Sequence, residues 1–473
     1  MTSSTFGVIV GNRGFFPIEL AQKGRIEIKE VLEEMGHKVI VLDEKETTYG
    51  TVGTRKEAEK CARLFRSHAD EIDGIIVVLS NFGDEKSAAD AIRLSGLRIP
   101  VLVQASPDDI HKMEMGQRRD SFCGKLSLCN NLTQYGIKFS LTGLHTCAIT
   151  SDEFRNDIKW FSSVCKVVNG LSKARIGAIG TRPSDFNTMR YSEKILERQG
   201  ISVETIDLSE ILAEAQALDN DDSDILNIIT EIKKYIDTFT NKVPDEKLSK
   251  MAKLFVVIKK WIDEKKLDAV AIQCWTSLEE NYGVVPCTIM SLLSQKLLPA
   301  ACEVDVTGAL SMLALQLASG VPSGIVDLNN NYGEDPDKLV LFHCGNLPSY
   351  FFNGIAMGFH DILMKTIGVS NACGTVNSRL KPGEFTFARM STNDLKGEIC
   401  GYIGEGLITD EDEDPLSTFG CYGVAHVFKL QSLLTELCKK GFEHHCAISR
   451  SQVADVLDEA LQNYLGWNIY YHK

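Results

Sequence analysis

Apolar runs and amphipathic stretches alternate along the first 105 residues of the chain. The apolar runs, which favour buried strands, cover residues 6–10, 38–42, 74–79 and 101–104. The stretches with helical periodicity cover residues 17–35, 55–68 and 84–94. Pro17 suits the start of the first helix and Gly36 its end. Strands that alternate with helices predict a parallel sheet wrapped by helices.

The same alternation starts again near residue 172. Further strands are expected at 175–179, 203–206, 269–273, 323–326 and 339–342. Helices are expected at 187–198, 223–265, 285–295 and 308–318. This second series predicts another α/β domain, which we place at residues 172–345.

From residue 347 onward the sequence becomes rich in Gly, Thr and short β-like runs, such as 386–389 and 397–403. Two helices, near 427–438 and 452–463, close the chain. We therefore expect an α/β protein with two Rossmann-like domains that contain parallel sheets, residues 1–171 and 172–345. A mainly β C-terminal domain with closing helices, residues 346–473, follows them.

Composition narrows the class of protein. The 473 residues carry a formal net charge of −14, and so acidic a chain repels nucleic acid. No apolar run reaches the roughly 18 residues that a membrane span needs, and the N-terminus does not resemble a signal peptide. The 14 cysteines are scattered without a C-x-x-C pair, as is typical of reduced thiols. A cytoplasmic protein without a membrane or nucleic-acid partner is expected.

Each α/β domain has a glycine directly after its first strand, in Gly11-Asn12-Arg13-Gly14 and Gly180-Thr181-Arg182-Pro183. Neither turn contains the G-x-G-x-x-G pattern, which argues against a dinucleotide cofactor. Both turns place an arginine, Arg13 or Arg182, at the carboxyl end of a strand, where open α/β sheets bind ligands. A ligand contact and an ordinary surface position are both open for each arginine.

Three successive strand-like segments end in acidic or imidazole side chains: Glu303, Asp327 and His343. If these strands are parallel neighbours, the three side chains meet at one edge of a sheet. Carboxylates with imidazoles suit manganese, magnesium, cobalt or iron better than structural zinc. The alternative is that the carboxylates cap the helices that follow them.

Glu443-His444-His445 near the C-terminus adds two imidazoles. Adjacent residues on a strand face opposite ways, so we expect at most one of these histidines to bind a metal. The other is expected to pack or to bind substrate. Glu279 and Glu280 are expected to be solvated charges.

The stretches ACEVDVTGAL, VDLNNNY, LFHCGN and EHHCAIS resemble the L-fucose and L-arabinose isomerase superfamily, whose members are metal-dependent aldose–ketose isomerases. The resemblance covers nearly the whole chain, although the chain is shorter than bacterial L-fucose isomerases and its third domain differs from L-arabinose isomerases. It implies that Glu303, Asp327 and His445 bind the metal, with His343 as a further ligand in some members. Manganese is the expected ion, with magnesium and cobalt as alternatives.

The resemblance also implies a reaction, in which a proton moves between C2 and C1 of a sugar through an enediolate. A hydride shift between the two carbons is the chemical alternative. Glu303 and Asp327 are the expected acid/base pair. Arg13, Trp275 and His444 are candidate sugar contacts, although Trp275 suits core packing equally well. L-Fucose, D-arabinose, L-arabinose and sulfoquinovose are all open as substrates.

The resemblance further implies a homo-oligomer, trimeric or hexameric, in which the first domain of a neighbour covers the metal site. Two other functions compete with the isomerase: a sugar-binding or sensory protein without catalysis, and a metal-dependent hydrolase.

Overall fold

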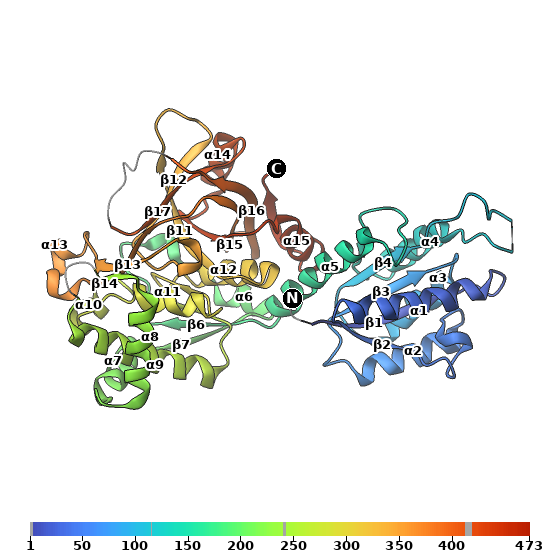
Figure 1. Ribbon diagram of the computed structural model, residues 1–473, viewed down its shortest axis with the longest axis horizontal. Helices are drawn as coiled ribbons and strands as arrows, with labels where there is room; N and C mark the ends of the chain where they lie inside the picture. Colours follow the sequence, from blue (N-terminus) through green and yellow to red (C-terminus); the bar gives the residue numbers. More distant parts are fainter. Residues whose placement is uncertain (1–2, 115, 240–242, 412–418) are drawn as a thin grey trace. The chain divides into compact units, whose positions relative to one another are not determined.

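The computed structural model describes residues 3–114, 116–239, 243–411 and 419–473. The chain forms two compact units (Figure 1). The first contains residues up to Asn169 together with Glu459–Gly466, and the second contains Gly170–Asp458 together with Trp467–Lys473. In the described residues, no helix is both long and apolar enough to cross a membrane.

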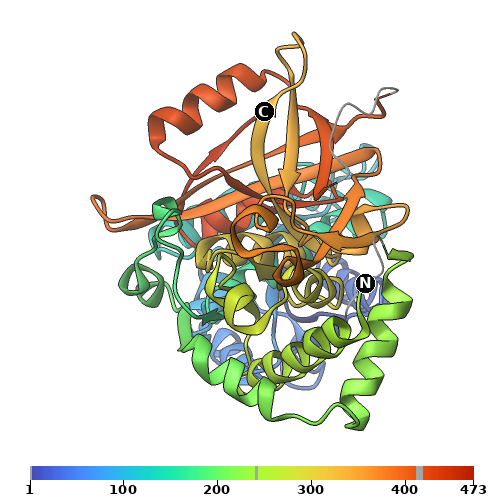
Figure 2. The ribbon, with the colours of Figure 1, turned by 90° about the vertical axis from the view of Figure 1, so that its left-hand side faces the viewer.

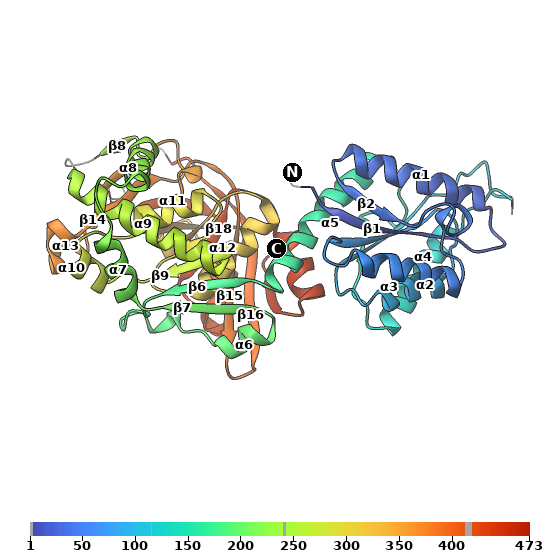
Figure 3. The same cartoon turned by 90° about the horizontal axis from the view of Figure 1, so that it is seen from below.

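The first unit is a doubly wound α/β domain, as expected from its alternating pattern. Its five strands are parallel in the order β2-β1-β3-β4-β5. Helices α1 and α5 pack on one face of the sheet and α2, α3 and α4 on the other (Figure 3). The strands are β1 (Thr5–Gly11), β2 (Lys38–Val41), β3 (Gly74–Leu79), β4 (Val101–Ala105) and β5 (Ser140–Leu141). The helices are α1 (Ile18–Glu34), α2 (Arg55–Ser67), α3 (Glu85–Ser95), α4 (Ser121–Gln134) and α5 (Asp152–Leu171).

The second unit begins with a second parallel sheet, in the order β10-β9-β6-β7. Its strands are β6 (Arg175–Ile179), β7 (Ser202–Ile206), β9 (Ala269–Ile272) and β10 (Ala300–Ala301). The helices around it are α6 (Glu193–Arg198), α7 (Leu208–Ala217), α8 (Ser223–Tyr235), α9 (Asp245–Lys265), α10 (Ser277–Tyr282), α11 (Cys287–Gln295) and α12 (Val306–Ser319). The single helix expected over 223–265 is wrong: it is two helices, and Pro244 directly precedes the second.

A ten-stranded, mostly antiparallel sheet forms the rest of the second unit (Figure 2). Its order is β19-β16-β15-β18-β11-β12-β17-β14-β13-β8. The strands are β8 (Thr238–Phe239), β11 (Ser323–Asn331), β12 (Lys338–His343), β13 (Ala356–Phe359), β14 (Cys373–Arg379), β15 (Gly383–Asn393), β16 (Glu398–Ile408), β17 (Cys421–His426), β18 (His445–Ser449) and β19 (Asn468–Tyr471). The helices are α13 (Met364–Ile367), α14 (Leu430–Lys440) and α15 (Ala454–Asp458), and a π-helical turn covers Glu459–Tyr464.

The two parallel sheets and the large, mainly β sheet confirm the expected fold class. The expectation that β11 and β12 run parallel is wrong, because they pair antiparallel within the ten-stranded sheet. Only residues 332–337 separate the two strands, and a parallel crossover needs a dozen residues or more. The division into three domains at 1–171, 172–345 and 346–473 stays a prediction.

Candidate metal centre

Three buried polar atoms converge where α12 meets the ten-stranded sheet. Nε2 of His445 lies 3.7 Å from Oε2 of Glu303 and 3.5 Å from Oδ1 of Asp327. None of these three atoms has a hydrogen-bond partner among the residues that the structure describes. Burying such atoms unpaired is costly, and a cation bound between them would satisfy all three at once. The donor set therefore fits a divalent metal ion that prefers oxygen and imidazole ligands.

The backbone brings these side chains together in two ways. Asp327 on β11 is the register partner of His445 on β18, so the two side chains lie on the same face of the sheet. Glu303 arrives from the turn between β10 and α12, where Glu303 and Val304 both have left-handed backbone, with φ of 59° and 55°. Such strain in non-glycine residues persists only where the surroundings enforce it, and it is frequent at functional sites.

Asp305, for which the sequence predicts no role, connects this turn to His445. Its side chain caps α12 by accepting a hydrogen bond of 2.8 Å from the backbone N–H of Gly308. The other carboxylate oxygen accepts a hydrogen bond of 2.8 Å from Nδ1 of His445. A carboxylate does cap the helix that follows β10, but it is that of Asp305, two residues beyond Glu303. Glu303 itself makes no cap contact in α12.

Arg389 on β15 holds Asp305 in its ionised form. The guanidinium is fully buried and forms a two-pronged ion pair with the carboxylate of Asp305. Burial alone would raise the pKa of Asp305, but the charge of Arg389 and the hydrogen bond from His445 outweigh it and lower that pKa. Glu443 accepts a further hydrogen bond of 3.2 Å from Nε of Arg389, so the buried guanidinium contacts two carboxylates.

Two of the candidate ligands, Glu303 and His445, have pKa values above their ordinary ones. Burial raises the pKa of Glu303 to about 7, while the nearby imidazoles of His445 and His343 act in the opposite direction. Burial would lower the pKa of His445, but the hydrogen bond to Asp305 raises it overall. A bound cation would reverse the effect on Glu303, because a positive charge favours the ionised carboxylate.

His343 lies beside this group but contacts sulfur atoms. Its Nε2 is 3.4 Å from Sγ of Cys302, and its Nδ1 is 3.6 Å from Sγ of Cys344. The ring centroids of His343 and His445 are 5.4 Å apart. His343 is therefore next to the centre, and its role as a metal ligand stays a prediction.

His444 also reaches the centre. Its Nε2 lies 3.7 Å from Oδ1 of Asp327, and one ligand atom each of Glu303, His444 and His445 lie within 4.8 Å of one another. The expectation that the two adjacent histidines face opposite ways is therefore wrong. The alternation rule does not apply here, because β18 begins at His445 and His444 precedes it.

An aromatic wall continues from His444. The ring of Phe186 contacts both His444 and Trp275, and the ring of Trp275 packs edge-on against His360. Trp275 is partly buried and packs against the hydrophobic core, yet its position beside Phe186, which contacts His444, also suits a sugar contact.

The expectation that Glu279 is a solvated charge is wrong. Glu279 is fully buried, whereas its neighbour Glu280 is exposed as expected. Both carboxylate oxygens of Glu279 accept hydrogen bonds from the backbone N–H of Trp275, at 3.3 and 3.2 Å. Burial raises the pKa of Glu279 to about 7.

The two candidate arginines are tied to their own turns. Nε of Arg13, in the first unit, donates a hydrogen bond of 2.8 Å to the carbonyl of Gly83, and its guanidinium also pairs with Glu85. The guanidinium carbon of Arg13 lies 4.4 Å from the ring centroid of Phe82. Arg182 donates to the carbonyl of Pro183. Roles for these arginines in ligand binding stay predictions.

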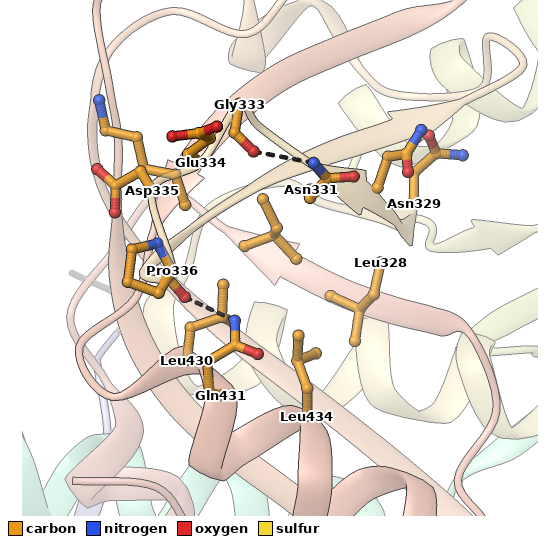
Figure 4. Close-up of a pocket in the computed structure, with 13 residues that line it drawn as sticks. Leu328, Asn329, Asn331, Gly333, Glu334, Asp335, Pro336, Leu430, Gln431 and Leu434 are labelled. Carbon is orange, nitrogen blue, oxygen red and sulfur yellow. Dashed lines mark hydrogen bonds between the residues drawn. The ribbon is translucent and has the colours of Figure 1, made fainter.

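The three asparagines after Asp327 line a separate hollow between the β11–β12 hairpin and α14 (Figure 4). Asn331 donates a hydrogen bond of 2.9 Å to the carbonyl of Gly333, and Gln431 donates one of 2.7 Å to the carbonyl of Pro336. The hydrogen bond of Asn331 favours a turn-forming role for this run of amides.

Comparison with known proteins identifies the family. The N-terminal domain of fucose/sulfoquinovose isomerases matches residues 7–172, and the C-terminal domain of L-fucose isomerase matches residues 341–473. The sulfoquinovose isomerases of Priestia aryabhattai and of Priestia megaterium (strain ATCC 12872 / QMB1551) are each 27% identical to this chain over 302 residues. That of Alkalicoccus urumqiensis is 26% identical over 303 residues.

These alignments cover 63% of this chain and 64% of each relative, so the chain spans less than two thirds of the relatives that it matches. The two domain matches lie on either side of the segment that contains Glu303 and Asp327, and the second match includes His445. Between them they account for most of the sequence, and on this basis the chain belongs to the L-fucose isomerase-like family.

Proposed function

We propose that this protein is a metal-dependent aldose–ketose isomerase. The observation that carries the proposal is the convergence of three unpaired buried atoms, Oε2 of Glu303, Oδ1 of Asp327 and Nε2 of His445. This donor set is rich in oxygen and suits manganese, with magnesium or cobalt as alternatives. Family membership supports the same reaction class.

The proposed roles follow from the chemistry of isomerisation. Glu303, Asp327 and His445 would hold a divalent cation, which would supply Lewis-acid stabilisation of the negative charge that develops on the sugar. Glu303 and Asp327 flank His445 and are the proposed acid/base pair that takes a proton from C2 and returns one to C1. Asp305 is a positioning residue, since it holds the imidazole of His445 with Nε2 toward the two carboxylates.

Sugar contacts are proposed along the aromatic wall. His444 lies at the junction between the carboxylates and Phe186, and its imidazole is partly exposed. Trp275 offers an apolar ring, which suits the C–H face of a sugar. L-Fucose, D-arabinose, L-arabinose and sulfoquinovose belong in the substrate panel, the last because three relatives carry the name sulfoquinovose isomerase.

We further propose a homo-oligomer, trimeric or hexameric, in which Arg13 of one subunit serves a neighbouring subunit. Arg13→Ala and Glu303→Gln subunits, each inactive alone, would be mixed, unfolded and refolded together. Shared sites predict partial recovery of activity, because some sites then combine an intact Arg13 with an intact Glu303. No recovery, or an active monomer in light scattering, contradicts the shared site.

Two other functions share the same centre: a sugar-binding or sensory protein without turnover, and a hydrolase that uses the cation to activate water. An aldose panel incubated with the manganese-loaded protein distinguishes them. Ketose formed without bond cleavage supports the isomerase. Saturable binding without product supports the sensor, and cleavage of a glycosidic or ester bond supports the hydrolase.

A further inference from the structure

A second donor set of different chemistry lies beside the proposed manganese ligands. Cys302, His343 and His445 are all buried, and one ligand atom from each lies within 4.8 Å of the other two. Sγ of Cys302 is 3.4 Å from Nε2 of His343. We propose that these three side chains form a site for a thiophilic divalent cation, such as Zn²⁺ or Cd²⁺, distinct from the oxygen-rich manganese site.

The ligand types decide which cation each site prefers. Zinc and cadmium accept thiolate and imidazole ligands in a tetrahedral arrangement, whereas manganese and magnesium favour carboxylate oxygens. Three protein ligands with one open position are a common zinc arrangement. Cys302 would bind as a thiolate and release its proton to solvent when the cation enters.

Further sulfur surrounds this second site. Sγ of Cys344 is 3.6 Å from Nδ1 of His343, and the Cys344 thiol interacts with the thiols of Cys302 and Cys287. The imidazole of His343 therefore has a sulfur atom within 3.4 Å of one ring nitrogen and another within 3.6 Å of the other.

The two sites share His445, and this sharing has a functional consequence. Nδ1 of His445 is committed to Asp305, so the imidazole has a single free nitrogen, Nε2. One nitrogen cannot bind two cations at once. A thiophilic cation on Cys302 and His343 should therefore exclude manganese and act as a competitive inhibitor of metal activation. The competition depends on the proposed manganese site, whereas binding of the soft cation does not.

Cadmium titration of the metal-free protein tests the binding directly. A thiolate-to-cadmium charge-transfer band in the near ultraviolet should grow and saturate at one equivalent. Cys302→Ser should abolish the band. Two matched variants should keep it: Cys373→Ser removes a buried thiol outside the trio, and Cys438→Ser removes an exposed one. No band in the unmodified protein overturns the proposal, as does a band that persists in Cys302→Ser.

X-ray absorption of the zinc-loaded, unmodified protein tests the same site without any substitution that might disturb folding. A sulfur neighbour at about 2.3 Å together with nitrogen neighbours is expected. A shell of oxygen and nitrogen alone overturns the proposal.

Addition of excess manganese to the cadmium-loaded protein then tests the competition. The charge-transfer band should fall as manganese takes Nε2 of His445. A band that stays constant while manganese binds shows that the two cations do not share His445, and it overturns the inhibitory role even if cadmium binding itself is confirmed.

Discussion

Asp305 accepts a hydrogen bond of 2.8 Å from Nδ1 of His445, and this contact directs Nε2 of the imidazole toward Glu303 and Asp327. The carboxylate also caps α12 and pairs with the buried Arg389. The side chain of Asp305 thus connects the start of α12, the buried guanidinium of Arg389 and the candidate metal ligand His445. Partners of this kind orient metal-binding histidines and tune their basicity.

Replacing Asp305 with Asn should weaken metal binding about 10- to 100-fold. Asn preserves the shape and the helix cap, but it removes the charge that holds Nδ1–H of His445. Equilibrium dialysis with manganese measures the affinity, on protein shown to be folded by circular dichroism. Asp84→Asn is the matched control, because Asp84 caps α3 through the N–H of Ser87 at 2.8 Å and lies in the other unit. Equal affinity in Asp305→Asn and the native protein contradicts the positioning role.

Glu303→Gln and Asp327→Asn should each lower kcat by at least about 10²-fold, the scale expected when acid/base catalysis is lost. Each amide keeps the size of the side chain but can no longer accept a proton as a carboxylate does. Steady-state kinetics at saturating manganese separates this loss from weaker metal binding. Glu334→Gln removes an exposed carboxylate on the β11–β12 turn and should leave kcat unchanged. Near-normal kcat in either variant removes that residue from the proposed pair.

The burial of Glu279 predicts a pH-dependent stability. Its pKa is raised to about 7 in the folded chain, above the ordinary value of 4.5. Well below pH 4.5 the carboxyl of Glu279 is protonated in both the folded and the unfolded chain, so it does not change the free energy of unfolding. As pH rises from there through 7, the unfolded chain ionises first, so this group lowers the free energy of unfolding by up to about 3 kcal/mol.

Glu279→Gln should remove that loss. Urea unfolding at pH 5 and pH 8 should show the variant gaining stability relative to the native protein by about 2 to 3 kcal/mol between the two pH values. Glu280→Gln, at the exposed neighbouring position, should show no such change. A stability difference between Glu279→Gln and the native protein that does not vary with pH would show that Glu279 is ionised in the fold.

Much of the fold could be predicted from sequence because its signals are local. The apolar runs of β1, β3 and β6 and the helical periodicity between them determine both parallel sheets. The sequence predicted β structure for the C-terminal part of the large sheet. It did not predict that β11 and β12 belong to the same sheet. The useful signal was the short connection at 332–337, which favours a hairpin over a parallel crossover.

The sequence indicated which residues form the candidate site, but not how the backbone brings them together. Glu303, Asp327 and His445 lie together as the motifs suggested, yet Asp327 and His445 meet through antiparallel register and not at a common strand end. Arg389 could not be predicted, because it lies 84 residues from Asp305 in sequence and pairs with it only in the folded sheet. The D-x-x-G pattern of Asp305 and Gly308 was a visible cap signal, although it does not reveal the second bond to His445.

The most direct test of the proposed function is a proton NMR assay of aldose turnover in D₂O, before and after exhaustive dialysis against EDTA. The manganese-loaded protein should convert at least one aldose of the panel to its ketose. Deuterium should appear at the carbon that receives a solvent-exchanged proton, as transfer through a carboxylate allows. Dialysis should abolish turnover and manganese should restore it. Full turnover by a demonstrably metal-free sample, or no ketose from any aldose with manganese bound, would contradict a metal-dependent isomerase.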